Sequence, residues 1–318
     1  MNRHQNKVTI VTAADDRYAP LLYELIRSIR DKPESAVVDI SVIATGMSQA
    51  MAELFSGLAD NLVDGYWTIK ISRWRMRNRE WLQGRAAKPY LPDYFPGYDT
   101  YLWIDADAWV ADWCAIELIL EACRDGSLAM GYDEVDTGFY PGRLTWYLGC
   151  VPVIQTYCMK HLRRSHMPRK LLKEIGMARP LNSGVFALRA DAEHWVSIQH
   201  HFETLTRRGR IFGSNQLAYV MAVHLDNLPF SRLPAWCNFM GDPVLETGTQ
   251  RLLMPHLPHE PVGIIHLSNR DQLRYDPHAR ITLHDLAGQT HASTLRYPLD
   301  PENTPEEIRT RLYPMSEY

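Results

Sequence analysis

The stretch Tyr101-Leu-Trp-Ile-Asp-Ala-Asp-Ala-Trp-Val110 places two aspartates directly after an apolar run. The run predicts a buried strand, and Asp105 and Asp107 follow at its end. In extended backbone, residues i and i+2 point to the same side, so both carboxylates are expected to converge on one point beyond the strand. Two adjacent carboxylates repel each other and lose hydration unless a cation lies between them. The pattern therefore favours a site for Mn2+ or Mg2+ over the alternative of an aspartate-rich turn.

Composition indicates an ordinary globular chain. The 318 residues include 22% charged residues and carry a net charge of −3, which excludes broad nucleic-acid binding. The sequence shows no apolar signal segment at residues 1–7 and no apolar stretch long enough to span a bilayer. Its five cysteines form no Cys-x-x-Cys pair. Together these features predict a cytoplasmic protein, with peripheral contact at the inner membrane left open.

Strand and helix patterns alternate along the first third of the chain. Strands are predicted at residues 7–12, 37–43 and 66–71, and helices begin at Ala19 and after Ser48. This alternation predicts an α/β fold with a Rossmann-like, mostly parallel sheet flanked by helices. Ligands of such sheets bind at the carboxyl ends of the strands, so the loop after the first strand and the aspartate pair are expected at one edge.

Three segments differ from this regular pattern. Residues 137–180 are less regular and are expected to form an insertion over the active edge, and residues 269–318 form a polar, Pro-punctuated, irregular C-terminal tail. The main domain is thus predicted at residues 1–268. Residues 72–85 are rich in Arg and Trp, which favours a solvated helix face with Trp anchors; contact with a phosphate, an acceptor or a membrane surface is the alternative.

Five short motifs in this order resemble the retaining glycosyltransferases of family 8, the group of glycogenin and the lipopolysaccharide galactosyltransferases. The resemblance covers residues 7–268. The motifs are the first strand with its following loop (Ala13, Asp15, Asp16, Tyr18), the aspartate pair (Asp105, Asp107), Asn182-Ser-Gly184, Asn215-Gln216, and His266 after Gly263-Ile-Ile.

The resemblance implies a GT-A fold that binds a nucleotide-sugar and a divalent metal. Asp105 and Asp107 match the Asp-x-Asp motif that holds Mn2+ (or Mg2+) on the donor diphosphate, and His266 matches the third metal ligand. For His266 the alternative is a buried structural residue. The loop after the first strand matches the segment that contacts uracil and ribose, and Lys88 matches a basic nucleotide contact, against the alternative of a surface lysine. The nucleotide-binding set implied by the resemblance is Ala13, Asp15, Arg17, Tyr18, Lys88, Ile104, Asp105 and Ala106.

Asp133, Asn182 and Gln216 match positions around the donor sugar. In retaining enzymes of this type the Gln side chain faces the anomeric carbon, and a carboxamide is a poor nucleophile. The implied mechanism is front-face substitution, in which the leaving diphosphate takes the proton of the incoming hydroxyl. A covalent route needs a carboxylate nucleophile, for which Asp133 is the candidate.

The chain departs from the family pattern in three places. Arg17 stands where relatives often carry Asn. Asn215 stands where relatives carry Asp, and the Gly-x-x-Lys-Pro-Trp segment that usually follows the metal-ligand histidine is absent. Arg270 and Arg274 are the candidates to replace its lysine.

The expected function is transfer of a sugar from a UDP-sugar to a hydroxyl acceptor, which is a polysaccharide, a lipid-linked glycan or a protein. Two alternatives stay open. A sugar nucleotidyltransferase would carry a Gly-rich phosphate loop after its first strand, and residues 13–18 contain no glycine. A non-catalytic nucleotide-sugar-binding protein is the second alternative, and Asn215 is the residue that favours it.

Overall fold

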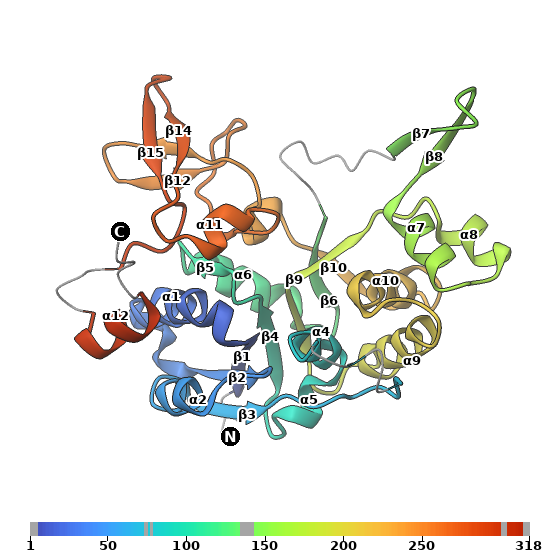
Figure 1. Cartoon of the computed structure of the whole chain (residues 1–318), viewed down its shortest axis with the longest axis horizontal. Coiled ribbons are helices and arrows are strands. Elements are labelled where there is room, and N and C mark those ends of the chain that lie inside the picture. Colours follow the sequence, from blue (N-terminus) through green and yellow to red (C-terminus); the bar gives the residue numbers. More distant parts are fainter. Residues whose placement is uncertain (1–5, 73–75, 77–78, 134–142, 300–303, 314–318) are drawn as a thin grey trace.

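The computed structural model of the chain describes residues 6–72, 76, 79–133, 143–299 and 304–313 (Figure 1). Seven strands in this part form one sheet in the order β10-β6-β9-β4-β1-β2-β3. Strands β1 to β4 run parallel to one another, β10 runs parallel to β6, and β9 is antiparallel to both of its neighbours. The predicted α/β class with a mainly parallel sheet is confirmed. The strands are β1 Val8–Ala14, β2 Val38–Ala44, β3 Asn61–Asp64, β4 Thr100–Ile104, β6 Leu128–Tyr132, β9 Leu181–Arg189 and β10 Phe230–Arg232.

Helices cover both faces of this sheet because side chains along β4 alternate between two cores. Leu102 and Ile104 pack in the core with α1, α2 and α6, whereas Tyr101 and Trp103 pack in the core with α4, α5, α9 and α10 (Figure 1). The predicted cap of α2 is confirmed, since Ser48 Oγ accepts a hydrogen bond from the Met51 N–H. The helices are α1 Ala19–Arg30, α2 Gln49–Ser56, α4 Leu82–Ala87, α5 Leu91–Tyr94, α6 Cys114–Ala122, α9 His194–Thr206 and α10 Ile211–His224.

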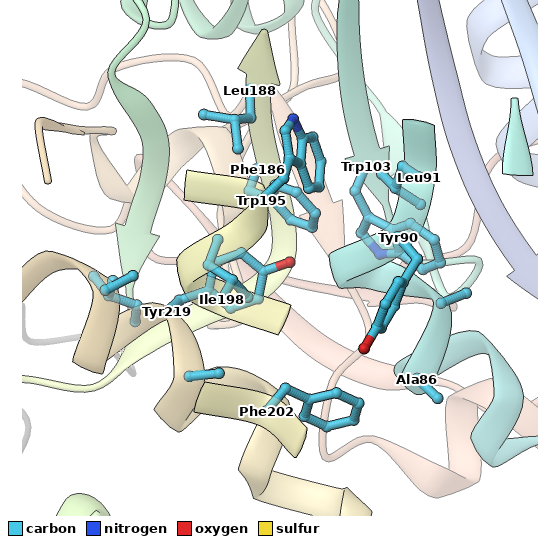
Figure 2. Close-up of a cluster of buried hydrophobic side chains, with 14 of the residues drawn as sticks. Ala86, Tyr90, Leu91, Trp103, Phe186, Leu188, Trp195, Ile198, Phe202 and Tyr219 are labelled. Atoms are coloured by element: carbon cyan, nitrogen blue, oxygen red, sulfur yellow. The ribbon is translucent and has the colours of Figure 1, made fainter. Parts of the chain in front are cut away.

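The second of these cores is rich in aromatic residues. Figure 2 shows Trp195 of α9 next to Phe186 of β9, with Trp103 of β4 nearby and Phe202 of α9 lower in the view. The Trp103 and Phe186 rings stack with their centroids 6.5 Å apart. This packing fixes the carboxyl end of β4, immediately before Asp105, against the helices of this face.

The predicted third strand at residues 66–71 is wrong, because the edge strand β3 lies at Asn61–Asp64 instead. The Tyr66 ring stacks on Tyr94 with centroids 4.3 Å apart, and the Tyr94 hydroxyl bonds both backbone groups of Tyr66. Thr68 Oγ1 donates to the Ala86 carbonyl. The aromatic and β-branched residues of this stretch therefore pack on α4 and α5 rather than in the sheet.

The segment expected to be irregular, residues 137–180, is regular where the structure describes it. It forms the hairpin β7 Arg143–Tyr147 and β8 Val151–Gln155, followed by α7 Tyr157–Arg164 and α8 Arg169–Ile175. Residues 137–142 lie outside the described residues, as do 73–75 and 77–78 of the Arg/Trp stretch. The motif Asn182-Ser-Gly184 lies within β9.

The C-terminal segment, predicted as an irregular tail, also contains helices and strands. These are α11 Asp271–Tyr275, β14 Ile281–Asp285, β15 Thr290–Ser293 and α12 Glu306–Leu312. Strands β14 and β15 join β11 Val244–Glu246 and β12 Arg251–Leu253 in a second sheet, seen at the upper left of Figure 1.

A buried ion pair ties this segment to the main sheet. The Arg296 guanidinium donates to both carboxylate oxygens of Glu24 on α1, at 2.6 and 3.1 Å, and each side chain is only 4% exposed. Breaking such a pair leaves an uncompensated buried charge, so the segment is anchored despite its polar composition. No described helix combines the length and apolar character that crossing a bilayer requires.

Candidate functional site

A cavity of about 420 Å3 lies at the carboxyl ends of β1 and β4. The residues assigned to the metal, nucleotide and donor-sugar sites all line it, except Ile104, which is fully buried in β4. Asp16, Asn215 and Arg270, also named from the sequence, do not line it. Other lining residues include Arg274, a candidate named from the sequence, and Trp81 and Arg85 of the Arg/Trp stretch. No pattern in the sequence indicated Tyr157, Phe212 and Tyr275.

A tight turn brings Asp105 and Asp107 together. The Ala108 N–H donates to the Asp105 carbonyl at 3.0 Å, so the backbone bends between the two aspartates. The prediction that they share a side because the backbone is extended is therefore wrong, although both side chains reach the same cavity.

A strand pair places His266 beside this turn. β13, Ile264–His266, pairs antiparallel with β5, Ala108–Val110, in a register that sets His266 opposite Ala108. Gly184 makes room for the imidazole, since a Cβ at that position would lie 2.4 Å from His266 Cε1. His266 can therefore lie next to Asp105 and Asp107 because of the register between β13 and β5 and because Gly184 has no side chain.

Asp105, Asp107 and His266 form a compact group of oxygen and nitrogen ligands. Their ligand atoms all lie within 4.8 Å of one another. His266 Nε2 is 3.3 Å from Asp107 Oδ1 and 3.9 Å from Asp105 Oδ2. His266 Nδ1 lies 2.8 Å from Asn238 Oδ1, which can only accept, so Nδ1 carries a proton and Nε2 is the ring nitrogen that faces the carboxylates.

The charges of His266 and Asp107 stabilise each other. Burial lowers the pKa of His266, but the Asp107 and Asp105 carboxylates outweigh it and hold that pKa above the ordinary value. Burial likewise raises the pKa of Asp107, but His266 and Arg274 outweigh it and hold that pKa well below the usual range. The carboxylate of Asp107 is therefore ionised at neutral pH, as a metal ligand must be.

Lys88 is buried rather than a surface lysine. Its ammonium group donates to Asp105 Oδ1 at 2.8 Å and to the Ser183 carbonyl at 2.6 Å. Trp103 Nε1 donates to the same Asp105 oxygen at 2.7 Å. Burial lowers the pKa of Lys88, and the Asp105 carboxylate opposes that shift. Lys88 and Trp103 together fix Asp105 Oδ1 and leave Oδ2 on the side of His266.

Asp133, Asn182 and Gln216 lie together at one end of the cavity, and their polar groups are paired. Asn182 Nδ2 donates to Asp133 Oδ1 at 3.0 Å. Gln216 Oε1 accepts from the Tyr157 hydroxyl at 2.6 Å, and Gln216 Nε2 donates to the Leu181 carbonyl at 3.2 Å. Burial raises the pKa of Asp133, opposed by the hydrogen bond from Asn182 and by His266.

Asn215, by contrast, does not line the cavity. It is fully buried, and its Nδ2 donates to Ser183 Oγ at 3.2 Å. Its Oδ1 has no hydrogen-bond partner among the described residues. A carboxylate at this position would be buried without a cation bonded to it, which is a physical reason for an amide here.

Asp15, Arg17 and Tyr18 line the opposite end of the cavity. Asp15 Oδ1 accepts from the Tyr18 N–H at 3.1 Å, which caps the short helical turn Asp16–Tyr18. The Tyr18 ring meets Tyr275 edge to face with centroids 6.1 Å apart, and the Arg17 guanidinium lies 4.7 Å from the centre of the Tyr275 ring. Helix α11 of the C-terminal segment thus forms part of this wall.

Of the two arginines predicted to replace the missing lysine, only Arg274 reaches the cavity. It donates to Asp107 Oδ2 at 3.0 Å and to the Tyr18 hydroxyl at 3.1 Å. Arg270 is bound to Asp242 at 2.6 Å and does not line the cavity. The signal for Arg274 in the sequence was only its position after His266, and Asn238 and Tyr157 gave no signal, because their contacts come from distant elements.

Comparisons with known proteins give distant structural likenesses. No protein-family model matches the chain, and no curated protein matches it. The chain is similar to several solved glycosyltransferases. An active-site mutant of LgtC shares 17% identity at a TM-score of 0.46, over 82% of this chain and 87% of that chain. GlyE of Streptococcus pneumoniae shares 15% identity at a TM-score of 0.47, over 85% of this chain and 56% of that chain.

Mouse xyloside xylosyltransferase 1 shares 10% identity at a TM-score of 0.48, over 83% of this chain and 98% of that chain. At such identities and TM-scores, these likenesses do not indicate which ligands this chain binds. The fold class rests on the sheet order and helix packing, and the chemistry of the site rests on its own geometry.

Proposed function

We propose that the chain is a metal-dependent, retaining glycosyltransferase that transfers a sugar from a UDP-sugar to a hydroxyl acceptor, as a divergent relative of the family-8 enzymes. The observation that carries the proposal is the group of Asp105, Asp107 and His266, whose ligand atoms lie within 4.8 Å of one another and line a cavity with polar residues at both ends.

The residues of this group fit a divalent metal by their donor chemistry. Two carboxylates and one imidazole suit Mn2+, and Mg2+ less well because it prefers oxygen ligands. Asn238 fixes the histidine proton on Nδ1, which leaves Nε2 free for a metal. A bound divalent ion would neutralise charge on the leaving diphosphate.

The cavity walls would orient the donor on either side of this group. Asp15 and Tyr18 would contact the uracil and ribose, with Arg17 and Arg274 adding positive charge near the diphosphate. Lys88 holds Asp105 in place and is itself buried, so we assign it a positioning role rather than direct contact with the nucleotide.

The donor sugar would lie at the end formed by Asp133, Asn182 and Gln216. The Gln216 amide is hydrogen-bonded at both its oxygen and its nitrogen, so its orientation is fixed. A carboxamide is also a poor nucleophile. This favours front-face substitution, in which the acceptor hydroxyl gives its proton to the departing diphosphate oxygen as its own oxygen bonds the anomeric carbon. Asp133 is the candidate nucleophile of a covalent route.

Both alternatives from the sequence have less support. A nucleotidyltransferase would be expected to carry glycines after β1, and residues 13–18 have none. The interpretation as a non-catalytic binding protein relied on Asn215, which is buried behind Ser183 and does not line the cavity.

The test is to incubate the protein with Mn2+ and a panel of UDP-sugars and to follow slow hydrolysis by NMR. The proposal predicts release of UDP and of a sugar that first appears in the same anomeric configuration as in the donor. A product that first appears in the opposite configuration would refute retention. Absence of UDP release from every donor, with and without simple glycoside acceptors, would refute the transferase assignment.

A further inference from the structure

Arg85 lies on the cavity wall as a cation without a polar partner among the described residues. Its side chain is half-buried, and in the described part of the chain no carboxylate or carbonyl accepts a hydrogen bond from its guanidinium. Lys88, one helical turn further along, is fully used by Asp105 and Ser183, and Arg274 is used by Asp107 and Tyr18. A guanidinium offers five donors, so Arg85 has capacity for a ligand.

An aromatic ring is placed next to this guanidinium by a kink in α10. Gly213 has φ +86°, and a Cβ there would lie 2.1 Å from His161 Cε1, so both backbone and packing require glycine. The kink turns Phe212 out of the helix, where its side chain is 51% exposed and lines the cavity. The Arg85 guanidinium lies 4.6 Å from the centre of the Phe212 ring.

A second exposed ring, Trp81, lines the same cavity and is 49% exposed. We call Trp81, Arg85 and Phe212 the rim. Large exposed aromatic rings beside an available guanidinium are an arrangement that can receive the apolar face of a sugar and an anionic substituent on it.

We infer that the rim is an acceptor subsite for an acidic sugar, one that carries a carboxylate or a phosphate. The inference rests on the proposed function and names the class of its acceptor. The anionic group pairs with Arg85, and the sugar ring contacts Phe212 and Trp81.

The position of the rim favours the acceptor over the donor diphosphate. The Tyr157 hydroxyl donates to Gln216 Oε1 at 2.6 Å and lies 3.2 Å from the Gly213 carbonyl oxygen, so Phe212 adjoins the sugar end of the cavity. Arg17, which also has no polar partner among the described residues, lies over Tyr275 at the nucleotide end. Arg85 is therefore assigned to the sugar end of the cavity and Arg17 to the nucleotide end.

The test measures binding of paired glycosides to the full chain, with and without UDP and Mn2+. The acidic members are p-nitrophenyl glucuronide, p-nitrophenyl galacturonide and a p-nitrophenyl hexoside 6-phosphate. Each is compared with the neutral p-nitrophenyl hexoside of the same sugar. We expect at least one acidic member to bind about tenfold or more tightly than its neutral partner, the effect typical of one hydrogen-bonded charge pair. Arg85→Gln should reduce this ratio to about one, whereas Phe212→Leu should weaken both members of the pair equally.

Arg124→Gln is the matched control, because it removes the same charge from an exposed arginine that pairs with Glu121 on α6, away from the cavity. Equal binding of acidic and neutral partners by the native protein, no binding of any glycoside, or an acid preference that survives Arg85→Gln would each overturn the inference. So would an Arg85→Gln variant that loses affinity for UDP instead of for acidic glycosides. If UDP fails to bind but the Arg85-dependent preference persists, the proposed function fails and the acidic-sugar subsite stands.

Discussion

The part of the cavity wall around Asp105 and Asp107, here called the acidic end, and the rim differ in how their charged side chains are paired. At the acidic end, the carboxylates of Asp105 and Asp107 have fixed partners in Lys88, His266 and Arg274. At the rim, the described residues offer Arg85 only an aromatic ring. The acidic end is buried, where an unpaired charge is costly, whereas the rim is partly exposed and can leave donors free. The acidic end is therefore organised before a ligand arrives, and the rim is completed by the ligand.

The largest expected effect comes from breaking the acidic end. Asp107→Asn removes the charge that His266 and Arg274 share while keeping the shape of the side chain. We expect metal-dependent affinity for UDP to fall by about 100-fold or more, the size typical of losing a charge-paired ligand group. Calorimetric titration measures it.

Asp242→Asn is the control for this change, because Asp242 pairs with Arg270 outside the cavity. Circular dichroism of both variants checks the fold. An Asp107→Asn variant that binds UDP with Mn2+ as tightly as the native protein would mean that Asp107 is not a metal ligand.

The next effect concerns the kink that builds the rim. Gly213→Ala places a Cβ both at φ +86° and against His161. We expect the free energy of unfolding to fall by about 3 kcal/mol, the combined size of backbone strain and overpacking. Denaturant unfolding measures it.

Gly126→Ala isolates the backbone part of this loss, because Gly126 has φ +90° and a Cβ added there would meet nothing within 4 Å among the described residues. We expect it to cost about 1 kcal/mol. If the two variants lose equal stability, His161 does not enforce the kink and the rim is less rigid than its packing indicates.

The smallest expected effect is on the orientation of Gln216. Tyr157→Phe removes the hydroxyl that donates to Gln216 Oε1. We expect kcat to fall about three- to tenfold with little change in KM for the donor, the size of one neutral hydrogen bond. Gln216→Ala should lower kcat further while also sparing donor affinity. A change confined to KM in either variant would show that this pair only binds substrate.

The sequence predicted the parts of this molecule that local patterns determine. The apolar stripe of α1, the strand before Asp105 and the cap at Ser48 follow from spacing and residue type within a few positions. It failed at residues 66–71, where β-branched and aromatic residues pack on Tyr94 and Ala86 instead of forming a strand. Residue type alone cannot distinguish these two kinds of burial.

The candidate site was predicted in its motifs but not in its supporting contacts. His266 was predicted as a metal ligand from its place in the series of motifs, whereas its position in the structure depends on the pairing of β13 with β5. Asn238, Tyr157 and Arg274 act through contacts between residues far apart in the chain, which no local pattern encodes. The C-terminal segment was predicted to be irregular because its buried anchors are few and scattered among polar residues.

The most direct test of the central claim is calorimetric titration of UDP into the protein with Mn2+ and then with EDTA. The arrangement of Asp105, Asp107 and His266 predicts binding with Mn2+ that EDTA abolishes. Equal binding in the presence of EDTA, or no binding with Mn2+, would contradict the proposal that these three residues hold a metal for a nucleotide diphosphate.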